Sequence, residues 1–244
     1  MLLHYTADGF LVILPRDDPR RVVDAMLETG YSEEFCLALN FQADFIAKLM
    51  KAGFLVMSVK LSPPEEDTDA AILDAFVLLP KLHLVRSILF FDNLHIKKSI
   101  KRILSRAVPH HFELRFDADF EYIVDHCIAV HGDEWLTPPL IDAIKAIRRN
   151  KPHGVYPASF ALYREGKLVA GEFGVIAGRV YTSYSGYYDE SNAGTAQLIL
   201  TARYLEEHGF AFFDLGMPLQ YKTDLGATDV SPQKFVELFR AAQE

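Results

Sequence analysis

Three long apolar segments in the C-terminal half of the chain are separated by very short turns, and this spacing restricts the fold more than any other feature. The segments cover residues 156–164, 167–176 and 179–187. Glu165-Gly166 and Ala177-Gly178 separate them, and a pair ending in glycine between strand-like runs is typical of a β-hairpin. We therefore predict a three-stranded antiparallel meander.

Helical patterns flank this meander on both sides. Upstream, two runs with apolar residues at helical spacing begin near residues 117 and 137, and downstream a longer run begins at Asn192 and ends at Gly209. A short apolar strand then ends on Asp214, and a last helix follows near the C-terminus. This order predicts an α+β fold with a mixed sheet flanked by helices, of the acetyltransferase-like (GNAT) type.

A polar segment at residues 62–69 separates a small N-terminal lobe from the rest of the chain. It contains two prolines and four acidic residues, which indicate a solvated loop. Before it, a strand at residues 9–14 and a helix from Pro19 to Gly30 indicate a mixed α/β lobe. We therefore divide the chain into a lobe at residues 1–69 and an acyltransferase-like domain at residues 70–244.

The segment His95–Arg106 is basic, although the protein is acidic overall with a formal net charge of -8. Apolar residues at helical spacing predict one buried face, and the charged residues on the other faces are all basic. A solvated helix face usually mixes both signs of charge, so we favour an anionic partner such as RNA phosphate over a plain solvated face. The basic residues are Lys97, Lys98, Lys101, Arg102 and Arg106.

The cysteines and the hydropathy pattern indicate a cytoplasmic protein. Cys36 and Cys127 form neither a CxxC pair nor a metal-ligand spacing, so we expect reduced, buried thiols and no metal. The N-terminal residues lack the pattern of a signal peptide. No window approaches the roughly 20 apolar residues of a membrane-spanning helix, so we expect no membrane contact.

Five segments resemble motifs of the leucyl/phenylalanyl-tRNA–protein transferase family. They occur in the family's order over residues 86–240, whereas the N-terminal lobe matches less well. They are Leu94–Leu104 (LHIKKSIKRIL), Glu134–Pro138 (EWLTP), Gly166–Val175 (GKLVAGEFGV), Asn192–Gly194 (NAG), and Phe213-Asp214 followed by Leu225–Ala227 (LGA).

The resemblance implies an aminoacyltransferase. The family transfers an amino acid from a charged tRNA to the N-terminal amine of a protein, a modification that creates an N-degron for protein degradation. The implied partners are therefore an aminoacyl-tRNA and an acceptor protein or peptide. No cofactor is implied, because the aminoacyl ester is already activated and the enzyme must align it with the amine, accept a proton and stabilise the oxyanion. We expect a monomer.

The resemblance also assigns roles to individual residues. The basic residues from Lys97 to Arg106 would contact tRNA. Trp135 would pack against the terminal adenosine, although a core anchor is an equal alternative. Asp214 and Tyr184 are the catalytic candidates, and Asp214 could instead be a strand-end cap or an ion-paired carboxylate. The other substrate-binding candidates are Glu172, Tyr181, Ser183, Ser185, Gly186 and Asn192.

The departures from the family pattern concentrate in the implied substrate pocket. Leu215-Gly216 follows Asp214 where the family has Cys-Gln, so the glutamine assigned to catalysis is absent. Tyr184 replaces a glutamate, and Gly186 replaces a pocket methionine. The side-chain selectivity of the transfer is therefore expected to differ from leucine and phenylalanine.

Glu172 is the departure with the clearest physical consequence, because it stands where the family has leucine or methionine. A buried carboxylate without a partner is costly, so a Glu172 facing the pocket would favour a basic or polar side chain. Alternatively, Glu172 faces solvent or pairs with a nearby cation such as Arg179. Tyrosine hydroxyls on the strand at residues 181–188 would replace lost polar contacts, or the tyrosines simply line a sheet edge.

Two other functions remain open. The fold order and the segment Asn192–Thr195, a thin version of a phosphate-binding turn before a helix, fit an acyl-CoA-dependent N-acyltransferase. The missing glutamine fits a non-catalytic binding protein on the same scaffold. Fold likeness alone does not decide among these functions.

Overall fold

The structure is a computed structural model that describes residues 3–61, 75–105 and 111–244. The chain forms two compact units. Unit 1 comprises Met1–Leu84 and Gly132–His153, and unit 2 comprises Val85–His131 and Gly154–Glu244. The boundary that we expected at residues 69–70 lies outside the described residues.

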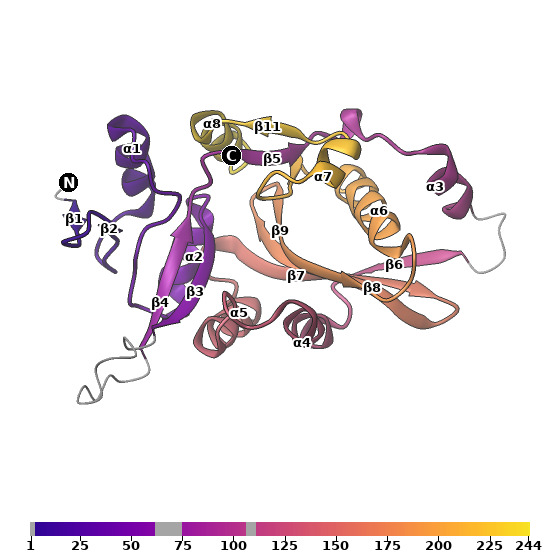
Figure 1. Ribbon diagram of the computed structural model, residues 1–244, viewed down its shortest axis with the longest axis horizontal. Coiled ribbons are helices and arrows are strands. Elements are labelled where there is room, and N and C mark those ends of the chain that lie inside the picture. The colour runs from indigo at the N-terminus through magenta and orange to yellow at the C-terminus, as the bar shows by residue number, and fades with distance from the viewer. Residues whose placement is uncertain (1–2, 62–74, 106–110) are drawn as a thin grey trace. The chain divides into compact units, whose positions relative to one another are not determined.

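The described residues of unit 1 form two small antiparallel sheets and three α-helices (Figure 1). Helix α1 begins after Asp18, whose carboxylate accepts from the backbone N–H of Arg20, and ends at Gly30 in the left-handed conformation. The elements are β1 (His4–Tyr5), β2 (Leu11–Val12), α1 (Pro19–Thr29), α2 (Ala43–Lys51), β3 (Leu55–Leu61), β4 (Ala75–Lys81) and α5 (Pro138–Asn150).

Unit 2 is built on a seven-stranded sheet with the strand order β11-β5-β10-β9-β8-β7-β6. Its strands are β5 (Arg86–Leu89), β6 (Phe112–Phe116), β7 (Val155–Arg164), β8 (Lys167–Ala177), β9 (Val180–Tyr188), β10 (Phe212–Asp214) and β11 (Thr228–Val230). Its α-helices are α3 (Lys98–Ile103), α4 (Phe120–His131), α6 (Ala193–Glu207), α7 (Gln220–Asp224) and α8 (Pro232–Ala241). Short 3-10 turns lie at Phe91–Asn93 in unit 2 and at Pro152–Gly154, where the chain passes from unit 1 to unit 2.

The predicted meander is confirmed as strands β7, β8 and β9, which pair antiparallel in sequence order. Glu165 and Gly166 turn the chain between β7 and β8 with positive φ angles of 54° and 77°. Gly178 turns it between β8 and β9, where an added β-carbon would lie 2.6 Å from the carbonyl oxygen of Ala242. The turn therefore depends on glycine for both its conformation and its packing.

The parallel pair of strands β9 and β10 separates after a short overlap. They pair from Val180 beside Phe212 to Thr182 beside Asp214. Strand β9 continues to Tyr188 and pairs with β8 on one side. On its other side, no strand of the described residues pairs with β9 beyond Thr182. The sheet therefore opens at the carboxyl end of β10.

Helices cover both faces of this sheet in unit 2 (Figure 1). Helix α4 packs on one face, where an added β-carbon on Gly171 would lie 2.7 Å from Ile123. On the opposite face lies α6, whose Ile199, Ala202 and Leu205 join the main buried cluster. The structure is thus the α+β fold that we predicted, with a mixed sheet flanked by helices.

Candidate functional site

Asp214 lies at the end of β10 with no exposed surface. Nε and Nη2 of Arg86 donate to its two carboxyl oxygens at 2.8 and 2.5 Å. The hydroxyl of Thr182 donates to it at 2.8 Å and the backbone N–H of Gly216 at 3.0 Å. The carboxylate therefore has a counter-charge and a full set of donors, which is what makes its burial tolerable.

These contacts determine the protonation state of Asp214. Burial alone would raise its pKa, but the charge of Arg86 and the hydrogen bonds outweigh burial and hold the pKa below its usual value. A carboxylate with a lowered pKa accepts protons poorly. The geometry thus shows the ion-paired carboxylate that we had weighed as an alternative, and a catalytic role for Asp214 stays a prediction.

Glu172 is the second buried carboxylate of unit 2, with 3% of its surface exposed. It lies in the middle of β8, opposite Gly186 on β9. Its Oε1 atom has no hydrogen-bond partner within the described residues. Glu172 therefore neither faces solvent nor pairs with Arg179, which is exposed.

Burial raises the pKa of Glu172 to about 7. The hydroxyls of Tyr181 and Ser183 and the charge of Lys222 act in the opposite direction and lower the pKa. Neither hydroxyl reaches Oε1 with the geometry of a hydrogen bond, and the Tyr181 hydroxyl is itself without a partner within the described chain. Two buried polar atoms of this region thus lack a hydrogen bond of standard geometry within the described residues.

Lys222 on α7 supplies a third buried charge in this region, with 6% of its surface exposed. Its Nζ donates to the backbone carbonyls of Leu215 and Met217 at 2.5 and 2.8 Å. Burial lowers its pKa to about 8, while the charges of Asp214 and Glu172 act to raise the pKa. Lys222 therefore fixes the chain after β10 and adds positive potential without forming an ion pair with Glu172.

The remaining strand candidates lie on β9 where it separates from β10. Tyr181 is fully buried, Ser183, Tyr184 and Ser185 are partly buried, and Gly186 is exposed. The backbone carbonyl of Gly186 lies 2.9 Å from Nε2 of His131 at the end of α4. The structure thus brings these candidates together with Glu172 and the end of β10 in one region of unit 2.

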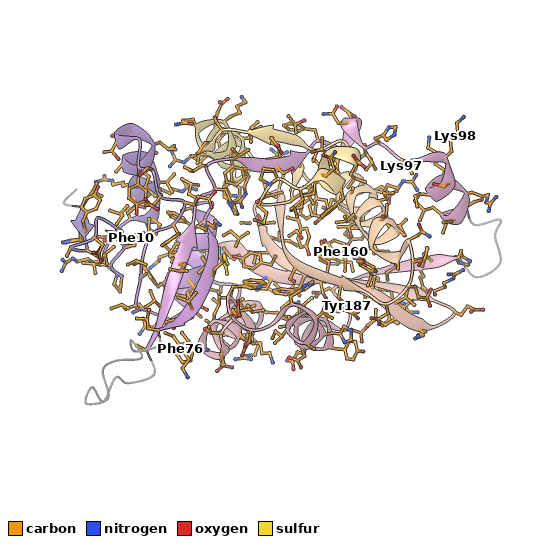
Figure 2. The ribbon with its side chains drawn as sticks, viewed as in Figure 1. Phe10, Phe76, Lys97, Lys98, Phe160 and Tyr187 are labelled. Carbon is orange, nitrogen blue, oxygen red and sulfur yellow. The ribbon has the colours of Figure 1, made fainter. Side chains whose placement is uncertain are left out.

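The basic segment forms a shorter helix than we predicted. Helix α3 spans Lys98–Ile103, and Ile100 on its inner side is buried in the main cluster. Lys97 precedes the helix, and its Nζ lies 3.0 Å from a carboxyl oxygen of Asp224. Figure 2 shows Lys97 and Lys98 on this part of unit 2.

The cations of α3 itself form a separate exposed group. Lys98, Lys101 and Arg102 are exposed and have no ion-pair partner among the residues that the structure describes. Arg106 lies outside those residues. The exposed cations therefore form a small surface of one charge sign in an acidic protein.

Two further candidates are placed by the structure in other surroundings. Trp135 belongs to unit 1, where it is partly buried and its backbone carbonyl accepts from the N–H of Ser58 at 2.9 Å. Asn192 precedes α6 in the left-handed conformation and its side chain makes no capping hydrogen bond. Neither observation tests a substrate contact, so both roles stay predictions.

Arg86, Thr182 and Lys222 were missed in the sequence analysis. Arg86 begins a short strand that is buried along its whole length, and a single cation there signals a buried ion pair. Nothing in the sequence marks Lys222 as buried. Its amine is held by backbone carbonyls of the segment after β10, and the sequence does not predict the path of that segment. The described residues contain no cluster of three or more metal-ligating side chains. Among their helices, none has the length and apolar character that crossing a membrane requires.

Comparison with known proteins identifies the family. The profile of the leucyl/phenylalanyl-tRNA protein transferases matches residues 88–240, which include Glu172, Asp214, Lys222 and the segment around α3. The chain belongs to this family. The resemblance stated from the motifs is therefore confirmed.

Individual relatives agree with this assignment. Leucyl/phenylalanyl-tRNA–protein transferases from Pseudomonas entomophila (strain L48) and Pseudomonas fluorescens (strain Pf0-1) are 27% and 29% identical over 62% of this chain and 66% of their own length. The enzyme of the same name from Maridesulfovibrio salexigens is 28% identical over 65% of each chain. The chain thus spans about two thirds of the length of these curated relatives.

Solved structures give a weaker likeness. L-PGS from Bacillus licheniformis is 13% identical, with a TM-score of 0.42 over 99% of this chain and 89% of that protein. A TM-score this low carries no argument about function.

Proposed function

We propose that this protein transfers an amino acid from an aminoacyl-tRNA to the N-terminal amine of an acceptor protein, with a side-chain selectivity that differs from leucine and phenylalanine. The observation that carries the proposal is the match of the family to residues 88–240, which include Glu172, Asp214 and Lys222. The GNAT-type description of unit 2 belongs to the same proposal. It is supported by the separation of β9 and β10 and by the long helix that follows β9.

In the proposed reaction, the acceptor amine attacks the carbonyl carbon of the aminoacyl ester. The new peptide bond forms as the ester bond to the terminal ribose breaks, and the ribose oxygen leaves with a proton while the amine loses one. Lys98, Lys101 and Arg102 would contact tRNA phosphates. Because the ester is already activated, alignment and oxyanion stabilisation account for most of the catalysis needed.

Asp214 acts in this scheme as a positioning residue. Its carboxylate accepts from the backbone N–H of Gly216 and from the hydroxyl of Thr182, so it holds the end of β10 against β9. Its lowered pKa makes it unsuitable for accepting the amine proton. Tyr184, partly buried on β9, remains the proposed catalytic contact to substrate.

The proposal is tested by a transfer assay with a mixed pool of charged tRNAs and a peptide library with varied N-terminal residues. We expect a labelled amino acid to appear on peptide N-termini. Transfer from acyl-CoA but not from any charged tRNA would contradict the proposal and favour an acyl-CoA-dependent enzyme. Absence of transfer from either donor would favour a binding protein.

The tRNA surface is tested by the double variant Lys98→Glu with Arg102→Glu. We expect filter binding of charged tRNA at low salt to fall and its salt dependence to become shallower by roughly one unit per lost phosphate contact. The matched control is Lys167→Glu with Arg203→Glu, which changes the net charge equally at exposed positions of unit 2. Equal losses in both variants would show a nonspecific charge effect and reject α3 as the contact.

A further inference from the structure

The buried polar atoms around Glu172 that lack hydrogen-bond partners bear on which amino acid the protein transfers. A carboxylate buried without a hydrogen-bond partner is destabilising, and an apolar residue at this position would avoid the cost. The neighbouring Tyr181 hydroxyl is also buried and unpartnered within the described residues. A carboxylate oxygen and a phenol hydroxyl thus lie near each other in unit 2, and neither has a hydrogen bond of standard geometry within the described residues. The hydroxyls of Tyr181 and Ser183 lower the pKa of Glu172, but no cation forms an ion pair with its carboxylate in that part of the chain.

The nearby cation of the protein does not fill this role. The Nζ atom of Lys222 is held by the carbonyls of Leu215 and Met217, and its charge reaches Glu172 only through space. Arg86 is already committed to Asp214 through two hydrogen bonds. Lys222 therefore adds positive potential near Glu172, but among the described residues no cation forms an ion pair with it.

Gly186 places no side chain of its own beside Glu172. It is the residue directly opposite Glu172, and it is exposed. An added β-carbon at Gly186 would lie 3.4 Å from the β-carbon of Glu172 and 3.1 Å from the carbonyl oxygen of Gly171. Beyond Thr182 no described strand covers β9 on the side of β10. In the proposal that follows, this is the side from which the side chain of a substrate would approach Glu172.

The geometry points to Glu172 as the residue that selects a cationic side chain on the transferred amino acid, with arginine preferred to lysine. A cation would complete the buried carboxylate, whereas leucine or phenylalanine would leave it unpaired in a drier environment. Arginine is preferred because its forked guanidinium can donate to the carboxylate and to the Tyr181 hydroxyl together. This inference rests on the proposed aminoacyl-tRNA-dependent transfer.

Binding is measured apart from turnover, so that the inference and the proposed function can fail separately. The probes are 3′-aminoacylamino-adenosines, stable analogues of the charged tRNA end, that carry arginine, lysine, leucine or citrulline. Citrulline has nearly the shape of arginine without its charge. We expect the arginine probe to bind roughly 10- to 100-fold more tightly than the citrulline and leucine probes.

Variants at Glu172 test whether this residue causes the preference. Glu172→Gln should remove the difference between the arginine and citrulline probes, and Glu172→Leu should favour the leucine probe. The matched control Glu207→Gln removes an exposed acid of the same unit and should keep the preference. Circular dichroism and thermal melting confirm that each variant is folded.

The transfer assay completes the test with arginyl-, lysyl-, leucyl- and phenylalanyl-tRNA. Transfer of arginine above leucine, reversed in Glu172→Leu, supports both proposals. Transfer of leucine with equal or tighter binding of the leucine probe overturns the inference and leaves the proposed function standing. Arginine-selective binding without any transfer supports the inference about the site and contradicts the proposed function. If Glu172→Gln slows transfer of every amino acid equally, Glu172 acts on the reacting atoms and the selectivity inference is wrong.

Discussion

Asp214 and Glu172 are both buried carboxylates, but their surroundings differ in the hydrogen bonds that they supply. Asp214 receives two hydrogen bonds from Arg86, one from Thr182 and one from Gly216. Glu172 is buried to a similar degree, but its Oε1 atom has no partner within the described residues. The pKa of Asp214 is lowered and that of Glu172 is raised to about 7. Asp214 is thus complete without a ligand, whereas Glu172 is not.

The largest expected effect comes from Asp214→Ala. The change leaves the buried guanidinium of Arg86 without a counter-charge, so we expect a loss of about 3–5 kcal/mol in the free energy of unfolding. Urea denaturation measures this loss. The double variant Asp214→Leu with Arg86→Met should be clearly more stable than Asp214→Ala, because no unpaired charge remains. A loss below about 1 kcal/mol in Asp214→Ala would show that the pair adds little to stability.

In contrast to Asp214→Ala, Glu172→Gln should raise the free energy of unfolding at high pH. The folded state holds the Glu172 proton up to about pH 7, whereas the unfolded state releases it near its ordinary pKa of 4.5. Between these values the folded state binds more protons, so stability falls as pH rises through this window and then levels off. The shift corresponds to about 3 kcal/mol at pH 8.

Denaturation of wild type and Glu172→Gln at pH 5 and pH 8 measures this contribution. The gain from the substitution should be large at pH 8 and small at pH 5. Asp214 should behave in the reverse manner, because its lowered pKa stabilises the fold above its unfolded pKa and this stability is lost as pH falls through the folded value. An equal gain at both pH values would show that the Glu172 carboxylate is not responsible.

A smaller difference in stability is expected between variants that remove the hydroxyl beside each carboxylate. Thr182→Val removes a 2.8 Å hydrogen bond to the buried Asp214 carboxylate and should cost about 2 kcal/mol. Ser183→Ala, on the next residue of β9, removes a hydroxyl of a partly buried side chain that interacts with the Glu172 carboxyl group. It should cost less, about 0.5–1 kcal/mol. Thermal denaturation of both variants gives the comparison, and similar losses would argue against the difference between the two sites.

The smallest effect is electrostatic. Lys222→Met removes a positive charge that lowers the pKa of Glu172, so the pKa of Glu172 should rise further. Carboxyl carbon shifts of Glu172 in a pH titration by NMR report this change. Lys167→Met, an exposed cation at the start of β8, is the control and should leave the titration unchanged. A fall in the pKa of Glu172 in Lys222→Met would contradict the described electrostatics.

Most of the elements that we predicted correctly depend on local sequence patterns. The meander of β7, β8 and β9 was predictable because its turns contain Glu165-Gly166 and Gly178, and these residues act on their immediate neighbours. The helix from Pro19 to Gly30 was predictable for the same reason, since its cap and its stop are local. Glu172 could also be singled out from its local sequence, because it is a charged residue within a predicted strand and a buried carboxylate needs a partner.

Long-range contacts explain what the sequence did not reveal. Helix α3 begins at Lys98 instead of near His95, because the backbone N–H of His95 donates to the carbonyl of Leu225 and holds the preceding chain outside the helix. Arg86 and Asp214 are 128 residues apart, and their pairing requires that β5 and β10 be neighbours in the sheet. That strand order is a property of the whole unit and leaves no trace in a sequence window.

The two outer strands of the seven-stranded sheet affect how readily the protein aggregates. An uncovered strand edge can recruit another chain and begin aggregation, and short or charged edge strands prevent this. Strand β11 is three residues long and carries Asp229, and β6 carries an ion pair between Glu113 and Arg115 at 2.8 Å. Both outer borders are thus poor templates for intermolecular pairing.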